Sequence, residues 1–408
     1  MYPRLSDLIQ DIFGIYVPLP IQTYGFLVAL AFTVGAIVAY YEIKRKEKEG
    51  VFLPFFVKEK IGEPAKISEL IISFVIGWFL GYKLGYGFSH YNEFVINPQT
   101  FLLSKEGSLV WGIIIGLLSA AYVWWDKHKK KLPKPKLVGR KVWPHELVGN
   151  LIVVAGIWGL IGAKIFHILA HIKDEFLIDP WGSIFSFGGL AFYGGFIVGF
   201  IAAVLYLRKY NINIVHILDI TALVMSVSYA VGRIGCQLSG DGCWGIVNTA
   251  PKPKWLSFLP DWMWAYNYPH NVINEGIKIP NCNDVFCHVL AQPVFPTPVY
   301  ESLTMFFVFF LLWSLRKKIK VPGTLFAIYL ILAGLERFWI EFIRITPRYH
   351  FLGIEATQAQ IISFIMIILG IVGLLYISFK PERVLQLAKT YPKEINKLPK
   401  NVEQIIEN

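Results

Sequence analysis

Long apolar runs separated by short polar segments dominate the chain. Nine of these runs are long enough to cross a bilayer, which takes about 20 apolar residues in a helix. They lie near residues 21–41, 67–89, 108–125, 146–171, 182–207, 216–236, 298–315, 324–343 and 358–379. The pattern therefore predicts an all-α polytopic membrane protein with about nine transmembrane helices.

The composition agrees with a membrane protein. The 408 residues are 55% hydrophobic and only 16% charged, whereas soluble domains carry about 25% charged residues. The formal net charge is +11, which in a soluble protein would point to nucleic acid. In a membrane protein the same excess has a simpler cause, because lysine and arginine gather in cytoplasmic loops. We therefore expect membrane lipid, and no nucleic acid, among the partners.

The placement of the basic residues predicts the orientation. If the N-terminus lies outside, the inside segments carry 27 lysines and arginines and the outside segments carry 8. Positive charge accumulates on the cytoplasmic side. The chain is therefore expected to have its N-terminus outside and its C-terminus in the cytoplasm.

Two regions outside the spans have a distinct character. Residues 237–297 form the one long outside segment, rich in Trp, Pro and Asn, and are expected to make a small extracytoplasmic cap on a transmembrane domain of residues 1–379. Residues 380–408 are basic and polar, which predicts a cytoplasmic tail with a short helix and frayed end. The four cysteines, Cys236, Cys243, Cys282 and Cys287, all fall near the cap. Either one or two disulfides brace the cap, or the thiols stay free; without a C-x-x-C pair, zinc is disfavoured.

The glycine-rich stretch 232–245 carries the first candidate site. It follows the apolar run 217–231, so Arg233 lies near the end of a span. A charged residue within a span costs about 2.5–3.5 kcal/mol and is retained for a partner or a function. Arginine suits a phosphate or carboxylate, and glycine lets the backbone approach a ligand closely. We expect Arg233 to hold a membrane-borne anion with Asp241 assisting; the alternative is that Arg233 only pairs with Asp241 or Asp219.

A second group of charges lies at the end of the eighth run. Arg337 and Glu341 are four residues apart and share a helix face, between Glu336 and Arg344. An ordinary ion pair at a helix end, worth about 0.2–0.5 kcal/mol, is the simpler reading. Four charges in nine residues at a membrane boundary nevertheless favour a functional role for Arg337 and Glu341. Arg344 is expected to reach toward the interface.

Other polar residues near the spans have weaker signals. Tyr193 stands between glycines and could carry a proton, and Tyr24 precedes Gly25, but aromatic belts account for both. Glu301 is a lone acid at the start of a run. His167 and His171 are four apart without an obvious third ligand, so no metal is expected.

One segment hints at internal repetition. Residues 77–86 resemble residues 159–167, and each segment places a lysine, Lys83 or Lys164, after small residues in a span. Convergent packing of small residues explains this similarity at least as well as duplication does.

Taken in order, these motifs resemble those of the prolipoprotein diacylglyceryl transferase family. The resemblance covers nearly the whole chain except about residues 45–140, where two extra spans are inserted; an even number preserves the orientation downstream. The matching elements are Tyr24-Gly25, Gly162-Ala-Lys164, Phe192-Tyr-Gly-Gly195, Asp219, Gly232-Arg-Ile-Gly235, Pro296-x-x-x-Tyr300-Glu301 and Glu336-Arg337-x-x-x-Glu341-x-x-Arg344.

The resemblance implies an enzyme of the bacterial inner membrane. Such an enzyme transfers the diacylglyceryl group of phosphatidylglycerol to the lipobox cysteine of a preprolipoprotein signal peptide, forms a thioether, and releases glycerol 1-phosphate. It implies no cofactor and no metal, and we expect a monomer. The expected catalytic residues are Arg233, Arg337, Tyr193, Glu341 and Asp241. The expected phosphatidylglycerol-binding residues are Arg233, Arg337, Tyr24, Gly235, Gly245 and Lys164.

The chain departs from the family pattern where the thiol must be activated. Tyr193 stands where many members carry histidine, and Cys236-Gln237 and Ser239 stand where amides and an aromatic residue are usual. Three ways of deprotonating the acceptor thiol therefore remain. Tyr193 acts as the base, or Asp241 or Glu341 assists, or the positive charge of the arginines alone favours the thiolate. The alternative function is a transporter of an anionic solute that uses the two arginines, although no inverted repeat of the kind typical of transporters is evident.

Overall fold

The structure is a computed structural model that describes all of the chain except residues 97, 186–190, 211, 352–353, 390–403 and 406–408. It divides into two compact units, which are treated separately. The main unit comprises Met1–Val17, Gln22–Leu53 and Pro144–Tyr391. The hairpin unit comprises Pro18–Ile21, Pro54–Trp143 and Pro392–Asn408.

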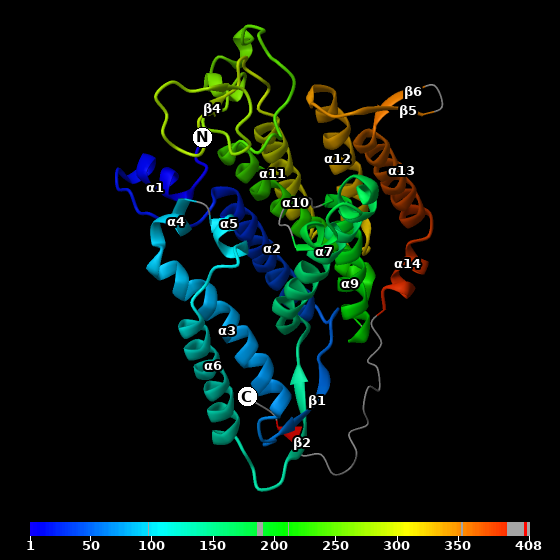
Figure 1. The fold of residues 1–408 in the computed structure, drawn as a ribbon. Helices are drawn as coiled ribbons and strands as arrows, with labels where there is room; N and C mark the ends of the chain where they lie inside the picture. Colours follow the sequence, from blue (N-terminus) through cyan, green and yellow to red (C-terminus); the bar gives the residue numbers. More distant parts are fainter. Residues whose placement is uncertain (97, 186–190, 211, 352–353, 390–403, 406–408) are drawn as a thin grey trace. The chain divides into compact units, whose positions relative to one another are not determined.

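Long helices make up most of the main unit (Figure 1). They are α1 (Leu5–Phe13), α2 (Thr23–Lys48), α7 (Val148–Ala170), α8 (Pro180–Phe185), α9 (Phe192–Lys209), α10 (Ile214–Ser239), α11 (Thr297–Leu315), α12 (Thr324–Ile340), α13 (Gln358–Phe379) and α14 (Pro381–Leu387). Short helical turns are η1 (Pro144–Leu147), η2 (Ile172–Phe176), η3 (Lys254–Leu256), η4 (Asp261–Met263) and η5 (Glu341–Ile343). Two small antiparallel pairs join β3 (Ile277–Lys278) to β4 (His288–Val289) and β5 (Arg348–Phe351) to β6 (Ile354–Thr357).

Helix α10 is the centre of the main unit. It packs against α2 and α11, and buried residues of these helices and α12 form one apolar core that includes Ala31, Leu223, Ala230, Met305 and Leu312. Small residues let the helices approach closely, as is common in membranes. A Cβ on Gly35 of α2 would collide with Ser228 of α10.

A buried glutamate fixes the far end of α11. Glu42 of α2 is only 2% exposed and accepts a 2.6 Å hydrogen bond from Arg316 Nε, just beyond α11. Arg45 pairs with the same carboxylate at 2.8 Å. The Arg316 guanidinium also lies 3.3 Å from the centre of the Trp313 ring. These contacts hold α2 against α11.

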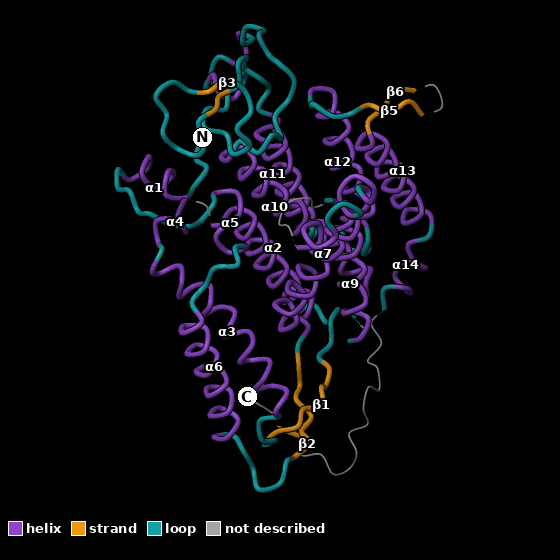
Figure 2. Tube along the Cα trace, viewed as in Figure 1, coloured by secondary structure: helices purple, strands orange, loops and turns teal. Residues whose placement is uncertain are grey.

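The hairpin unit contains a helical hairpin and a small sheet. Its helices are α3 (Ile67–Ser89), α4 (Tyr91–Ile96), α5 (Pro98–Leu103) and α6 (Leu109–Lys129). Strand β1 (Phe55–Ile61) pairs antiparallel with β2 (Lys136–Val142), so that Phe55 lies opposite Val142. Strand β7 (Gln404–Ile405) lies parallel to β2. Figure 2 shows β1 and β2, which the all-helical pattern did not predict, in segments that connect helices.

The α3–α6 and α7–α9 hairpins repeat each other. Helices α3 and α7 both have 23 residues, and each residue of α7 stands 81 positions after its counterpart. Both end at a histidine, His90 or His171, with nearly the same backbone angles (φ −121°, ψ 46° and φ −119°, ψ 33°). The ring of each histidine packs against the ring four residues earlier, Tyr86 or His167, with centroids 4.1 and 4.4 Å apart.

The entry to the second helix of each hairpin also matches. The Ser108 amide donates to the Tyr82 carbonyl at 2.9 Å, and the Ala191 amide donates to the Ala163 carbonyl at 3.0 Å. A Cβ on Gly81 would collide with the Trp111 carbonyl, just as one on Gly162 would collide with the Gly194 carbonyl. Similar composition alone does not produce this common register, so the repetition involves whole hairpins.

Seven of the described helices are long and apolar enough to cross a membrane: α2, α3, α6, the continuous segment Pro144–Ala170, α10, α11 and α13. The multi-pass helical architecture is confirmed, but the number nine is not. The run 324–343 forms α12 of only 17 residues, followed by η5. The run 182–207 is not one helix, because α9 begins at Phe192 after the separate α8; residues 186–190 lie outside the described part.

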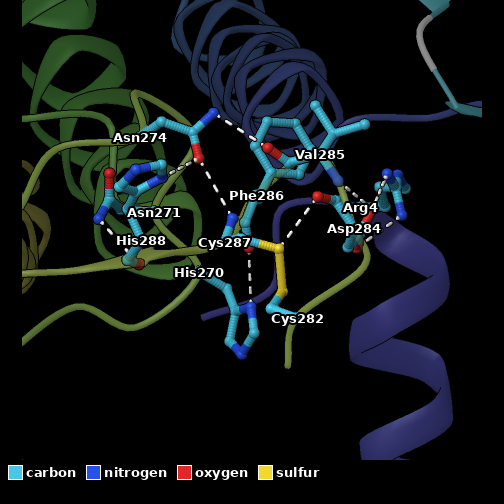
Figure 3. Close-up of a disulfide and its surroundings, with 10 residues drawn as sticks. All are labelled: Arg4, His270, Asn271, Asn274, Cys282, Asp284, Val285, Phe286, Cys287 and His288. Carbon is cyan, nitrogen blue, oxygen red and sulfur yellow. Dashed lines mark hydrogen bonds and ion pairs between the residues drawn. A yellow bond between two sulfur atoms is a disulfide. The ribbon is translucent and has the colours of Figure 1, made fainter. Parts of the chain in front are cut away.

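The cap contains a disulfide and is bound to the N-terminal segment by an ion pair between Arg4 and Asp284. A disulfide joins Cys282 to Cys287, whereas Cys236 and Cys243 are free thiols. Of the expected alternatives, the cap therefore has one disulfide. Figure 3 shows Arg4 beside this bridge, where it forms two hydrogen bonds with Asp284 at 2.7 and 3.1 Å. The predicted helix of the C-terminal tail is α14; most of the residues beyond it lie outside the described part.

Candidate functional site

A fully buried glutamate lies among three arginines at the start of α11. Glu301 Oε2 is 2.5 Å from Arg233 Nε, and Oε1 is 3.3 Å from Arg337 Nη1 and 2.8 Å from Arg344 Nη1. The glutamate side chain is 0% exposed, and those of the arginines are 16%, 24% and 12% exposed. Segments far apart in the sequence thus converge on one carboxylate.

The end of α12 supplies a second carboxylate. Arg337 Nη2 lies 2.9 Å from Glu341 Oε2, which confirms the ion pair predicted from the four-residue spacing. Glu341 is buried, and its Oε1 accepts a 2.6 Å hydrogen bond from the Thr346 hydroxyl. Glu341 therefore fixes the guanidinium of Arg337 from the side away from Glu301.

The ion pairs of this arginine cluster leave one positive charge in excess when the carboxyl of Glu336, which interacts electrostatically with Glu301 and the arginines, is uncharged. Arg233, Arg337 and Arg344 form ion pairs with Glu301 and Glu341. Burying an unbalanced charge is costly, so such a cluster favours an anionic ligand. Among the described residues, the Tyr229 hydroxyl and Glu336 Oε1 are buried without a hydrogen-bond partner. Buried polar atoms of this kind call for an explanation, and a bound ligand would supply one.

Two helix contacts position Arg233 within α10. Its guanidinium lies 5.0 Å from the centre of the Tyr229 ring, one turn earlier, which is favourable for a cation. Gly235 packs against Leu27 and the ring of Tyr24 on α2. A side chain at Gly235 would press on both, so this glycine brings α2 and Tyr24 up to the arginine turn.

Gly245 ties the cap to the arginine cluster. Its amide donates to the Phe295 carbonyl at 2.8 Å, and the next amide, of Ile246, donates to the Ile343 carbonyl at 2.8 Å. The strand-like pairing of Gly245 with Arg344 places the backbone where a Cβ would collide with the Ile343 carbonyl. Gly245 is therefore required for the close approach that positions Arg344.

Neither carboxylate suggested by the sequence is the ion-pair partner of Arg233. That partner is Glu301. Asp219 instead accepts hydrogen bonds from the amides of Gly323 and Phe326, at 2.9 and 3.1 Å, and so caps the start of α12. Asp241 Oδ1 accepts from the Cys243 amide at 3.1 Å.

The residues that depart from the family pattern have defined partners. Cys236 Sγ lies 3.7 Å from Arg233 Nη1. Gln237 Oε1 accepts a 2.6 Å hydrogen bond from the buried Tyr268 hydroxyl of the cap, and the Ser239 hydroxyl donates to the Gly235 carbonyl at 2.8 Å. A hydrogen bond from the Cys236 thiol lowers the pKa of the Cys243 thiol to about 7. The changes therefore join α10 to the cap and put two thiols beside Arg233.

The remaining predicted site residues lie on the α7–α9 hairpin. Lys164 belongs to α7, next to Ala163, whose carbonyl receives the amide at the start of α9. Tyr193 is in the first turn of α9, and its side chain falls outside the described part of the structure. The contacts described above thus bring together Arg233, Arg337 and Glu341, with Tyr24, Gly235 and Gly245 around them.

Sequence reasoning missed two members of the cluster. Glu301 was noted as a lone acid and as part of a family motif, but it was not predicted as a site residue, because its partners are distant in sequence. Arg344 was expected to reach toward the interface, and this was wrong, since its side chain is 12% exposed and bonded to Glu301. The signal for both was the low frequency of charge near a membrane span, where an acid and extra arginines imply mutual pairing.

Comparison with known proteins gives consistent results. The family model described as prolipoprotein diacylglyceryl transferase matches residues 10–140 and, in a second stretch, residues 134–376. The first stretch includes residues 45–140, which the resemblance found in the sequence left out. Because α3 and α6 repeat α7 and α9, the added hairpin itself has the character of the family.

Individual relatives carry the same description. A protein of Leptospira interrogans named phosphatidylglycerol–prolipoprotein diacylglyceryl transferase is 30% identical over 281 residues, which cover 61% of this chain and 76% of that protein. A Clostridium tetani protein of the same name is 31% identical over 64% of this chain and 88% of its own length. One from Clostridioides difficile is 30% identical over 66% and 88%.

Proposed function

Because the chain belongs to the prolipoprotein diacylglyceryl transferase family, we propose that it transfers the diacylglyceryl group of phosphatidylglycerol to the thiol of a lipobox cysteine. The acceptor is the signal peptide of a preprolipoprotein, and the products are a thioether and glycerol 1-phosphate. The names of the relatives supply the donor and the class of acceptor.

The arginine cluster is the observation that carries the proposal. Three guanidinium groups and two carboxylates, next to membrane helices, leave one positive charge for one anion. A phosphodiester carries one negative charge, and the planar fork of arginine matches its oxygens. Low polarity around the site strengthens this attraction relative to water.

The cluster suits the departure of a phosphate. The thiolate attacks the terminal glycerol carbon, a carbon–sulfur bond forms, and the carbon–oxygen bond breaks as the phosphate oxygen takes the electron pair. Arg233 and Arg337 stabilise the charge that develops on this oxygen. Glu301 and Glu341 hold the two forks in place, and Arg344 shares Glu301.

Other residues have supporting roles in this proposal. Tyr24, Gly235 and Gly245 border the arginine cluster and help to shape the phosphatidylglycerol site. Lys164 is a further candidate for binding the lipid. Its counterpart in the first hairpin, Lys83, contacts backbone carbonyls, so a lipid-binding role would distinguish the two lysines. The candidates for taking the thiol proton are Tyr193, Asp241 and Glu341. The enzyme acts as a monomer in the bacterial inner membrane, with its N-terminus outside and its C-terminus in the cytoplasm.

A transfer assay tests the proposal. The full chain in phosphatidylglycerol vesicles should move radiolabelled diacylglyceryl to a lipobox peptide, but not to a matched peptide with serine in place of the cysteine. No transfer by the wild type would instead favour the transporter of an anionic solute, which can be checked as anion uptake by the same vesicles.

The Arg233→Ala variant tests the central residue. Loss of one preorganised donor costs about 100- to 1000-fold in turnover, and we expect a loss of this size. Arg233→Lys should recover only a small part, because lysine lacks the planar fork. Arg348→Ala, in an exposed strand, is the matched control and should retain activity. Full activity in Arg233→Ala would refute the phosphate-binding role.

A further inference from the structure

Two thiols and a carboxylate converge beside Arg233. Cys236 lies in the last turn of α10, while Asp241 and Cys243 follow in the next loop. Gly240 and Gly242 have φ angles of 65° and 87°, which only glycine adopts readily, and they turn the loop back over the helix end. As a result, one ligand atom from each of Cys236, Asp241 and Cys243 lies within 4.8 Å of the other two.

We propose that Cys236, Asp241 and Cys243 bind one Zn²⁺ ion, whose fourth position takes the thiol of the acceptor cysteine. Zinc prefers four tetrahedral ligands drawn from thiolate, imidazole and carboxylate, and catalytic sites use three protein ligands and one open position. Tetrahedral bonds of about 2.3 Å to sulfur and about 2.0–2.2 Å to oxygen place the ligand atoms less than 4.8 Å from one another, so the observed grouping allows one ion to reach all three.

The charge around the three ligands suits a zinc ion. Two thiolates, one carboxylate and Zn²⁺ together carry one negative charge, and Arg233 Nη1 lies 3.7 Å from Cys236 Sγ. Groups that contact the ligands in this way orient them and tune the metal. Since Arg233 also contacts Glu301, it links the zinc ligands to the arginine cluster. A thiol on the metal would therefore stand near the phosphate that must leave.

The zinc ion would activate the acceptor, a step that rests on the proposed function. The acceptor thiol binds the metal as a thiolate and releases its proton to solvent, because coordination deprotonates a thiol. The thiolate then attacks the glycerol carbon, and the phosphate leaves with the electron pair of the broken carbon–oxygen bond. The product thioether is a weaker zinc ligand and leaves. No oxidant or reductant is needed, and neither Tyr193 nor Glu341 has to serve as the base.

Two rival states of these groups make different predictions. Cys236 and Cys243 could form a disulfide, like Cys282 and Cys287, and would then bind no metal. A second possible cluster, His167, His171 and Glu175, has nitrogen and oxygen ligands only. A metal on that cluster would lack thiolate ligands, which spectroscopy can distinguish.

Metal binding is tested on the purified full chain, carrying an affinity tag free of histidine. We expect one zinc ion per chain by elemental analysis, and thiolate-to-cobalt charge-transfer absorption when Co²⁺ replaces it. Cys236→Ser and Cys243→Ser should lose this absorption, and Asp241→Asn, which preserves size, should weaken Co²⁺ binding at least about tenfold. The control variants His167→Gln and Cys282→Ser/Cys287→Ser should keep both signals.

The proposal is overturned if the reduced wild type binds neither Zn²⁺ nor Co²⁺, or if Cys236 and Cys243 are recovered as a disulfide. Retention of the thiolate absorption in the Cys236→Ser/Cys243→Ser double variant would also overturn it. These measurements need no transfer activity, so they remain decisive if a variant is inactive. The wild-type spectra need no variant and remain decisive if a substitution prevents folding.

The fourth position is tested with the acceptor itself. A lipobox peptide with cysteine should change the visible Co²⁺ spectrum, whereas the same peptide with serine should not. Equal spectra with both peptides would refute thiol coordination, even if the metal is bound. Removal of zinc should abolish transfer, and readdition should restore it; transfer unaffected by removal would refute the catalytic role. Zinc binding without any transfer by the wild type would instead refute the proposed function.

Discussion

The α3–α6 and α7–α9 hairpins have the same internal geometry, but only the second carries the Phe-Tyr-Gly-Gly sequence of the family. At the positions of Tyr193 and Gly194, the first hairpin has Val110 and Trp111. Helix lengths, the terminal histidines and the linking amide bond are shared. The shared features therefore show what the fold requires, and the differences indicate where function has constrained the sequence.

The largest difference between the hairpins is which helix carries the large side chain where the two helices cross. In the first hairpin a Cβ on Gly85 would collide with Trp111, whereas in the second a Cβ on Gly194 would collide with Phe166, the counterpart of Gly85. Each hairpin thus needs one large and one small residue at this crossing, since cores tolerate swaps that conserve volume. Packing does not decide which helix carries the large residue. In α9 the small residue, Gly194, stands directly after Tyr193, which belongs to the proposed site.

The lysine common to both hairpins, Lys83 or Lys164, is a shared feature and therefore indicates a structural role. Lys83 Nζ contacts the carbonyls of Ser104 and Glu106, the latter at 2.8 Å, and lies 3.5 Å from that of Phe101. These carbonyls belong to the segment that leads into α6. Lys164 holds the equivalent position in α7, so the comparison favours a role in shaping the hairpin over one in binding lipid.

The substitution Gly194→Trp should have the largest effect. The new side chain would collide with Phe166, and overpacking of this kind costs about 1–3 kcal/mol; we expect lower thermal stability and loss of transfer. The double variant Phe166→Gly/Gly194→Trp recreates the Gly85–Trp111 arrangement and should recover stability but not transfer. Melting in detergent and the transfer assay measure the two effects.

The mirror-image variant in the first hairpin is the control. Gly85→Phe/Trp111→Gly exchanges bulk in the same way, and we expect it to retain both folding and transfer. Normal transfer by Phe166→Gly/Gly194→Trp would contradict the conclusion that function determines the placement of the small residue in α9.

Exchanging the two lysines for methionine should have an intermediate effect. Lys83→Met leaves buried carbonyls without their cation, at a cost of about 1–3 kcal/mol for each unsatisfied group. We expect a lower melting temperature for Lys83→Met with KM for phosphatidylglycerol unchanged. For Lys164→Met we expect the same loss of stability, a lower kcat, and again an unchanged KM. A selective rise in that KM for Lys164→Met would instead identify Lys164 as a lipid ligand.

The sequence predicted those features that depend on local order. The apolar runs 67–89 and 358–379 coincide with the observed helices α3 and α13. The spacing of Arg337 and Glu341 predicted their contact, because one helical turn brings them together. The similarity around Lys83 and Lys164 pointed to the repeat, although only the backbone register distinguished it from convergent packing.

Features that depend on contacts between distant segments could not be predicted in this way. Glu301 has no charged neighbour within a helical turn, and its three arginines come from α10, α12 and the segment after η5. The closeness of Cys236 and Cys243 depends on the left-handed angles of Gly240 and Gly242, which spacing alone does not determine. The early start assigned to α9 had a similar cause, since apolar residues in α8 continue the hydrophobic run without continuing the helix.

Removing the first hairpin should have the smallest effect on transfer. All the residues of the arginine cluster and all three proposed zinc ligands belong to the main unit. Phe55 and Val142 pair across β1 and β2, so a short Gly-Ser linker can replace residues 56–141 without stretching the chain. Glu47 and His145 flank the deletion and are bonded at 2.8 Å through the His145 amide, which keeps the two ends together.

We therefore expect the shortened protein to insert, melt cooperatively and transfer diacylglyceryl at a rate close to that of the full chain. The same deletion combined with Arg233→Ala should be inactive, which verifies that the measured transfer comes from the arginine cluster. If the shortened protein folds but transfers poorly, the repeated hairpin contributes to catalysis or to lipid delivery. Val110 and Trp111 would then have a function of their own. They would not simply be residues that changed after the first hairpin lost the function of Tyr193 and Gly194.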